Sequence, residues 1–186
     1  RLKTYQVISL GVARTFQNLR LFAASSVLDN VMTAAQQHYK YSFFEAVSHM
    51  GRWKRMEKAT RDESMELLER VGLADRADQA AGNLPYGLQR RLEIARAISL
   101  RPDLLLLDEP AAGMNAEEVE QLNELIKLIH SDFNLTILLI EHHMDMVMEI
   151  CPHIVCMNFG AKIAEGSPDE IQSHPEVLKA YLGEEE

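Results

Sequence analysis

The stretch DLLLLDEPAAGMN, residues 103–115, decides the fold. Its four consecutive leucines, 104–107, predict a short strand that is buried on both faces. Asp108 and Glu109 follow at the C-terminal end of this strand, and Pro110 stops it. One acid of such a pair can hold Mg²⁺ while the other polarises an attacking water. Taken alone, the stretch fits equally well a buried strand whose acids only cap the next helix.

The rest of the chain alternates between predicted strands and helices. A second continuous apolar run, 135–140, predicts another buried strand, and 154–157 and 162–164 predict two shorter strands joined by a turn at 158–160. Capping signals and apolar residues at helical spacing predict helices over 26–39, 40–59, 60–72, 85–99 and 116–131, and a last helix that begins at Ser167. Strands without alternation, interleaved with helices, are typical of a parallel sheet covered on both sides.

We therefore expect an α/β fold with a parallel sheet and an inserted helical subdomain. In this interpretation residues 1–25 and 100–186 build the sheet-containing core. Residues 26–99, which are almost entirely helical by pattern, build the inserted subdomain.

Composition and charge narrow the class of protein. The chain has 186 residues, of which 47% are hydrophobic and 25% are charged, as is typical of a globular domain. A net charge of −9 with scattered basic residues argues against a nucleic-acid partner. Two cysteines do not make a disulfide framework and favour a reducing compartment. No apolar run reaches the roughly 20 residues that cross a bilayer, and the first residues do not resemble a signal peptide.

Four segments in a fixed order resemble the motifs of a known family. They are VARTFQ (12–17), LPYGLQRRLEIARA (84–97), LLLLDEPAAGMN (104–115) and ILLIEHHMD (137–145). Together they are similar to the Q-loop, the signature motif, the Walker B motif with its D-loop, and the switch-histidine loop of ABC-transporter ATPases. The Pro-Tyr-Gly form of the signature and the ending HPEVLKAYLGE (174–184) most resemble the ATP-binding subunits of branched-chain amino acid importers.

This resemblance implies catalytic and metal-binding roles for four residues. Asp108 binds Mg²⁺, mostly through water, and Glu109 polarises the hydrolytic water. His142 contacts the γ-phosphate of ATP. Gln17 touches Mg²⁺ or the water and transmits the state of the site to the membrane partner.

The resemblance also implies nucleotide contacts made across a dimer. Pro85, Tyr86 and Gly87 start a helix whose N-terminal amides face the γ-phosphate of ATP held by the opposite protomer, and a helix N-terminus favours an anion. Asn115 belongs to the D-loop, where Asp is frequent in the family. Leu88 stands where the family usually has Gln, which removes an amide near the phosphate.

The loop that cradles the phosphates in this family is not found in the 186 residues. Its pattern is G-x-x-x-x-G-K-[ST]. Only Gly82 has another glycine five residues later, at Gly87, and Leu88 and Gln89 follow in place of Lys and Ser or Thr. We expect this loop upstream of Arg1, and we expect the 186 residues by themselves to be inactive.

The implied function is that of an ATP-hydrolysing motor subunit of an importer for branched-chain amino acids, at the cytoplasmic face of the cell membrane. Its cofactors are ATP and Mg²⁺. Its partners are a second ATPase subunit, transmembrane permease subunits and, indirectly, a periplasmic or surface substrate-binding protein. Three alternatives stay open: a regulatory paralogue without a P-loop, the ATPase of a urea or amide importer, and that of a lipopolysaccharide exporter. A chromosome-maintenance ATPase is disfavoured because the chain is acidic and shows no sustained heptad.

Overall fold

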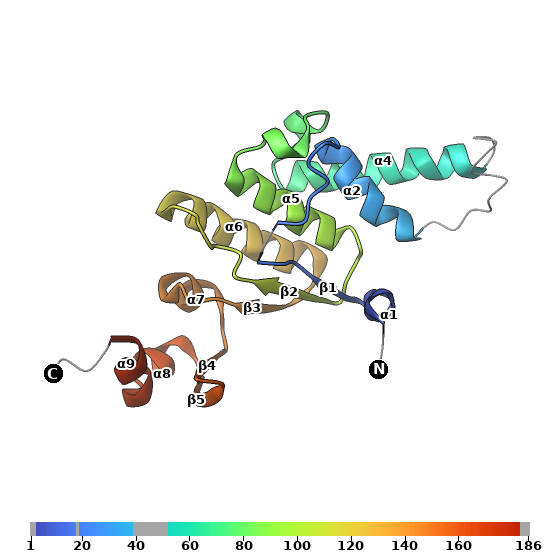
Figure 1. Ribbon diagram of the computed structural model, residues 1–186. Helices are drawn as coiled ribbons and strands as arrows, with labels where there is room; N and C mark the ends of the chain where they lie inside the picture. Colours follow the sequence, from blue (N-terminus) through green and yellow to red (C-terminus); the bar gives the residue numbers. More distant parts are fainter. Residues whose placement is uncertain (1–2, 18, 39–51, 183–186) are drawn as a thin grey trace. The chain divides into compact units, whose positions relative to one another are not determined.

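The computed structural model describes residues 3–17, 19–38 and 52–182. The chain divides into two compact units, Arg1–Ile140 and Glu141–Glu186. The first unit contains a three-stranded sheet and the longer helices, and the second contains a two-stranded sheet and three short helices (Figure 1). No described helix combines the length and the apolar character that a membrane span requires.

The sheet of the first unit is parallel, as the leucine-rich strands predict. Its strands are β1 (Val12–Arg14), β2 (Leu104–Asp108) and β3 (Thr136–Ile140), in the order β1-β2-β3. In the register, Asp108 of β2 lies beside Ile140 of β3. The carboxyl ends of β2 and β3 therefore meet at one edge of the sheet.

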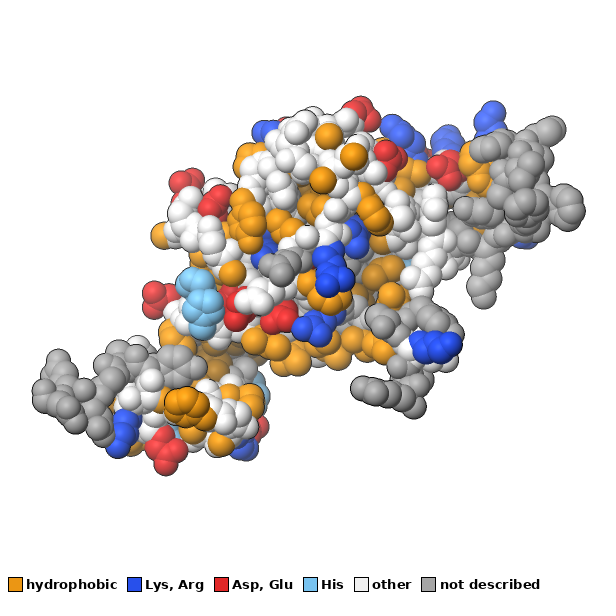
Figure 2. Space-filling model, in the orientation of Figure 1, with side chains coloured by type: hydrophobic (Ala, Val, Ile, Leu, Met, Phe, Trp, Pro, Cys, Tyr) orange, Lys and Arg blue, Asp and Glu red, His pale blue; other side chains and the backbone are white. Residues whose placement is uncertain are grey.

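The two faces of this sheet differ in burial. Leu105 and Leu107 are fully buried. Helices α5 (Tyr86–Ile98) and α6 (Ala116–Phe133) lie on one side of the sheet in Figure 1. On the other face Leu138 is 54% exposed and Ile140 is 55% exposed, and Figure 2 shows apolar side chains gathered below the sheet. β3 thus differs from the expectation of burial on both faces.

The helical part of the first unit begins where the sequence predicts. Helix α2 (Val27–Ala35) has Ser26 as its N-cap, and the Ser26 hydroxyl accepts a hydrogen bond from the Asp29 backbone N–H. The short helix η1 (Gln36–His38) follows, and α1 (Thr4–Ile8) precedes β1. Before α5, the chain forms two further short helices, η2 (Ala74–Arg76) and η3 (Ala81–Asn83).

The predicted helix boundary at Thr60 is wrong. Helix α4 runs without interruption through Arg52–Arg70. Thr60 is buried inside it and its hydroxyl donates to the Met56 carbonyl at 2.9 Å, one turn back, so it does not cap a new helix. The rest of the helix predicted over 40–59, residues 40–51, lies outside the described residues.

The second unit is a hairpin packed against short helices. Strands β4 (Ile154–Asn158) and β5 (Ala161–Gly166) pair antiparallel around a turn in which Phe159 and Gly160 both have positive φ. Helices α7 (Met144–Ile150), α8 (Pro168–Gln172) and α9 (Pro175–Leu182) complete the unit. Ser167 caps α8, as predicted, and Cys151 and Cys156 are free thiols.

Candidate functional site

The candidate site lies at the carboxyl end of β2, where the backbone turns sharply. Asp108 is the last residue of the strand, and Glu109 follows with a φ of 45°. The Glu109 backbone N–H donates to the Ile140 carbonyl at 2.8 Å, which ties the turn to β3. A left-handed backbone at a residue other than glycine is uncommon and is often kept at functional positions.

Gln17 reaches this turn from the segment that follows β1. Its side-chain amide nitrogen donates to the Glu109 carboxylate at 2.5 Å, across 92 residues of sequence. The Thr15 backbone N–H bonds to the Leu106 carbonyl at 2.9 Å and extends the ladder beyond β1, so Gln17 is placed close to the end of β2. The structure therefore brings together the predicted site residues Gln17, Asp108 and Glu109.

Sequence reasoning missed a further charged residue at this edge. The Arg14 guanidinium, at the end of β1, forms an ion pair with the Asp108 carboxylate at 2.7 Å. Arg14 lies directly opposite Leu106 in the register, two residues from Asp108. The VARTFQ segment contains Arg14, but nothing in the sequence alone pairs it with an acid 94 residues away.

The residues at this edge fit a magnesium ion. Asp108 and Glu109 supply carboxylate oxygens, Gln17 supplies an amide oxygen, and hard oxygen ligands are those that Mg²⁺ takes. Both carboxylates are half-buried. Arg14 opposes the binding of a metal ion at this edge, since its positive charge already balances that of Asp108.

The signature segment lies at the start of α5. Pro85 is the N-cap of this helix, and Tyr86 and Gly87 are its first residues. A side chain at Gly87 would have its Cβ only 3.1 Å from the Glu118 carboxylate, so glycine lets the start of α5 approach the start of α6. Asn115 caps α6, and its side-chain oxygen accepts the Glu118 backbone N–H at 3.0 Å. The predicted nucleotide-binding residues therefore lie at two neighbouring helix starts. Pro85, Tyr86 and Gly87 are at the start of α5, and Asn115 is at the start of α6.

The predicted residue His142 belongs to the second unit, close to the start of α7. Its backbone N–H donates to the Glu141 carboxylate at 2.9 Å, and Nδ1 of His143 lies 2.9 Å from the same oxygen. The Glu141 side chain is buried, while the His142 imidazole is largely exposed. Glu141, which the sequence reasoning did not single out, holds the histidine segment in place.

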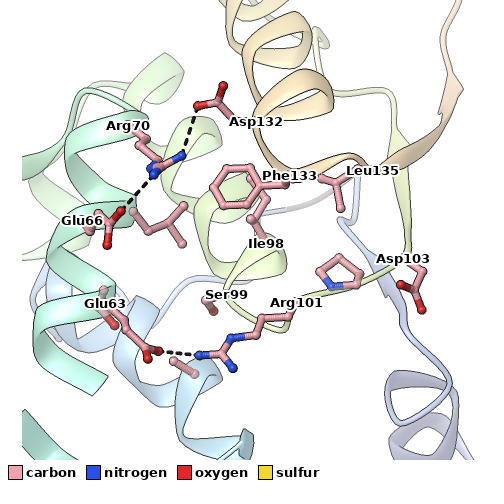
Figure 3. A pocket seen from close by; sticks show the side chains of 14 residues that line it. Glu63, Glu66, Arg70, Ile98, Ser99, Arg101, Asp103, Asp132, Phe133 and Leu135 are labelled. Atoms are coloured by element: carbon pink, nitrogen blue, oxygen red, sulfur yellow. Dashed lines mark hydrogen bonds and ion pairs between the residues drawn. The ribbon is translucent and has the colours of Figure 1, made fainter. Parts of the chain in front are cut away.

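A cavity of about 510 Å³ lies at the opposite end of the strands, where β2 and β3 begin (Figure 3). Its lining includes Arg70, which bonds Glu66 on α4 and Asp132 on α6, so the ion pairs join these two helices. Arg101 and Glu63 form another pair. These guanidinium groups are already balanced by carboxylates, and the cavity is remote from the end of β2 that carries Asp108 and Glu109.

Comparison with known proteins places the chain in a family. Residues 2–112 match the family model described as "ABC transporter", and residues 161–186 match "Branched-chain amino acid ATP-binding cassette transporter". The chain is 44% identical over 180 residues to BraF of Pseudomonas aeruginosa, a high-affinity branched-chain amino acid transport ATP-binding protein, with 97% of this chain and 71% of the relative covered. It is 44% identical to the LivG protein of Escherichia coli K12, which has the same description, covering 96% of this chain and 70% of the relative.

Solved structures agree with this result. The ADP conformation of MJ1267, an ATP-binding cassette of an ABC transporter, has a TM-score of 0.77 at 27% identity, covering 96% of this chain and 71% of that one. A nucleotide-free ATP-binding cassette of an ABC transporter has a TM-score of 0.74 at 26% identity, with the same coverage. The chain therefore belongs to the ATP-binding subunits of ABC transporters, the ATPases that couple ATP hydrolysis to transport.

Proposed function

We propose that this protein is the ATP-hydrolysing subunit of an importer for branched-chain amino acids. Its likeness to BraF and LivG over nearly the whole chain supports the cargo. The observation that carries the catalytic part is the meeting of Gln17, Asp108 and Glu109 at one edge of the parallel sheet. The subunit acts at the cytoplasmic face of the cell membrane as part of an ATPase dimer, with permease subunits and an external substrate-binding protein.

In this proposal each residue at the edge of the sheet has a separate task. Asp108 and Gln17 hold Mg²⁺, which when bound with ATP offsets the negative charge that develops on the phosphates. Glu109 orients the attacking water and takes its proton, and the bond from Gln17 orients the Glu109 carboxylate. His142 contributes a hydrogen bond to the terminal phosphate.

The signature segment contributes to the site of a second protomer. Pro85, Tyr86 and Gly87 form the start of α5, a 13-residue helix, and the free N-terminal N–H groups of this helix face an ATP γ-phosphate. Asn115, at the start of α6, lies on the same surface and completes the nucleotide-binding set. Residues 1–25 and 100–186 form the core in this proposal, and residues 26–99 form the helical subdomain.

The surface that follows Gln17 suits a membrane partner. Phe22 is 50% exposed, although its backbone is fixed by two hydrogen bonds to the Asn30 side chain, at 2.9 and 3.1 Å. The Arg96 guanidinium stacks over its ring at 5.3 Å. Burial lowers the pKa of Arg96, although the charge of Glu93 acts in the opposite direction. An exposed aromatic ring on a rigid backbone is a typical anchor for a protein partner, here a permease subunit.

Reconstitution tests this function. The full-length subunit is assembled with its permease partners in vesicles. ATP hydrolysis is then measured in the presence of a substrate-binding protein that carries leucine, isoleucine or valine. We expect hydrolysis to rise with these amino acids and to be unchanged by urea. Stimulation by urea alone, or none by any amino acid, would contradict the proposed cargo.

A further inference from the structure

Helix α5 contains a fully buried arginine that the functional roles above do not use. The Arg90 side chain is 0% exposed, one turn after the signature segment. Its guanidinium pairs at 2.7 Å with Glu93, which is also buried. A buried charge is costly unless it is paired and its hydrogen bonds are satisfied. The remaining contacts of this pair therefore indicate what it is for.

The two terminal nitrogens of the guanidinium also reach the backbone of the segment that contains Gln17, while Arg90 Nε has no hydrogen-bond partner among the described residues. One terminal nitrogen of Arg90 donates to the Phe16 carbonyl at 2.9 Å, and the other donates to the Gln17 carbonyl at 3.1 Å. The second carboxylate oxygen of Glu93 accepts from the Phe16 backbone N–H at 3.5 Å. The pair thus bonds the backbone N–H and carbonyl of Phe16 and the carbonyl of Gln17.

The same guanidinium also contacts the signature segment. The terminal nitrogen that bonds the Gln17 carbonyl lies 3.1 Å from the Tyr86 hydroxyl, and the Tyr86 ring lies 5.8 Å from the guanidinium carbon. Gln17 in turn bonds Glu109. A continuous set of contacts therefore runs from Tyr86 through Arg90 and the Gln17 backbone to the Glu109 carboxylate.

We propose that Arg90, supported by Glu93, is a positioning residue for ATP hydrolysis that couples the signature segment to Glu109 through the backbone of Gln17. This inference rests on the proposed roles of Gln17 and Glu109. When α5 moves as its N-terminus meets the nucleotide of the second protomer, the Phe16–Gln17 backbone moves with it. Because the Gln17 amide is bonded to Glu109, this movement changes the orientation of the Glu109 carboxylate.

Only the planar guanidinium of arginine can make the contacts that this positioning role requires. Lysine keeps the positive charge beside Glu93, but its ammonium is a single point of donation at the end of a flexible chain. It cannot bond the Phe16 and Gln17 carbonyls and the Tyr86 hydroxyl in the same geometry. Arg90→Lys therefore weakens the coupling while leaving the ion pair largely intact.

The test is the kinetics of ATP hydrolysis by the assembled transporter. We expect Arg90→Lys to lower kcat roughly tenfold, because small displacements of catalytic groups are costly, while KM for ATP stays within about twofold. The matched control is Arg91→Lys, since Arg91 lies next in the same helix and bonds the Val71 carbonyl and Gln121, away from Gln17. Rates are divided by the number of nucleotide-binding sites measured by titration, so a loss of folded protein does not change kcat.

If Arg90→Lys does not fold, a second variant tests the same proposal. Glu93→Gln has one acceptor oxygen where the carboxylate has two, so either Arg90 or the Phe16 N–H loses its partner, and we expect kcat to fall with KM unchanged. A folded Arg90→Lys or Glu93→Gln protein with the kcat of the wild type overturns the positioning role. Near-normal hydrolysis by Glu109→Gln overturns the proposed function instead, whatever the Arg90 variants do.

Discussion

Gln17 and Glu109 are joined by a hydrogen bond of 2.5 Å, although 92 residues separate them in sequence. The bond fixes one carboxylate oxygen of Glu109 and leaves the other available to a water molecule. It also connects Glu109 to the segment that leads to the exposed ring of Phe22. A contact at Phe22 and the chemistry at Glu109 are therefore linked by five residues of chain and one hydrogen bond.

Glu109→Gln removes the proposed base and keeps the shape of the side chain. In the assembled transporter we expect ATP turnover to fall by roughly 10²–10⁴-fold, the usual contribution of a general base. We expect ATP binding to be kept, because none of the proposed phosphate contacts involves this carboxylate. Glu120→Gln, an identical change at an exposed position of α6, is the control and leaves turnover unchanged. Equal turnover in the two variants would show that Glu109 is not the base.

In the proposed metal site, Arg14 and Mg²⁺ would compete for the charge of Asp108, so Arg14→Met tests that site. We expect the Mg²⁺ concentration for half-maximal hydrolysis to fall by about two- to fivefold, since a partly exposed ion pair contributes up to about 1 kcal/mol. The effect shrinks as salt is raised, because salt screens exposed charges.

Arg20→Met is the matched control for Arg14→Met. The Arg20 guanidinium stacks on the same Phe16 ring, at 4.7 Å against 5.5 Å for Arg14, but no bond to Asp108 is found for it in the described residues. The control should keep the Mg²⁺ dependence of the wild type. An unchanged Mg²⁺ dependence in Arg14→Met would remove Asp108 from the proposed metal site.

Strand β2 and the position of Asp108 and Glu109 at its end could be predicted because their signals are local. Continuous leucines give β2, and the two acids at its end are adjacent in sequence. Arg14 and Arg90 could not be predicted, because their partners are 94 and 74 residues away. By composition alone an arginine belongs on the surface. Only the folded chain shows that Arg90 is enclosed and bonded to the segment of Gln17.

Helix boundaries show the same limit of local signals. Thr60-Arg-Asp-Glu63 has the sequence of a capping box, but α4 continues through it. The motif needs an extended backbone at its first residue, and the long helix already bonds the Thr60 hydroxyl to Met56. At Ser26 the same kind of motif does cap a helix, so the sequence pattern alone does not distinguish the two cases.

Asn115→Ala removes the capping bond to the Glu118 backbone N–H. We expect the free energy of unfolding to fall by about 1 kcal/mol, the usual cost of losing an N-cap. Asn115→Asp keeps the acceptor and should keep the stability. If Asn115 also contacts nucleotide, Asn115→Asp changes KM for ATP at equal stability. Equal denaturant midpoints for the wild type and Asn115→Ala would show that the cap contributes nothing measurable.

Phe22→Asp tests the surface proposed for the permease subunit. Phe22 is half exposed and its backbone is held by Asn30, so an aspartate fits without unfolding the subunit but puts a charge where an apolar anchor is needed. We expect the ATPase subunit to keep its thermal midpoint and to lose most co-purification with the permease. Phe159→Asp is the matched control, since Phe159 is 103% exposed in the β4–β5 turn at a φ of 45°, which aspartate tolerates. Unchanged co-purification of Phe22→Asp would exclude Phe22 from the interface, and a lowered thermal midpoint would assign it to the core instead.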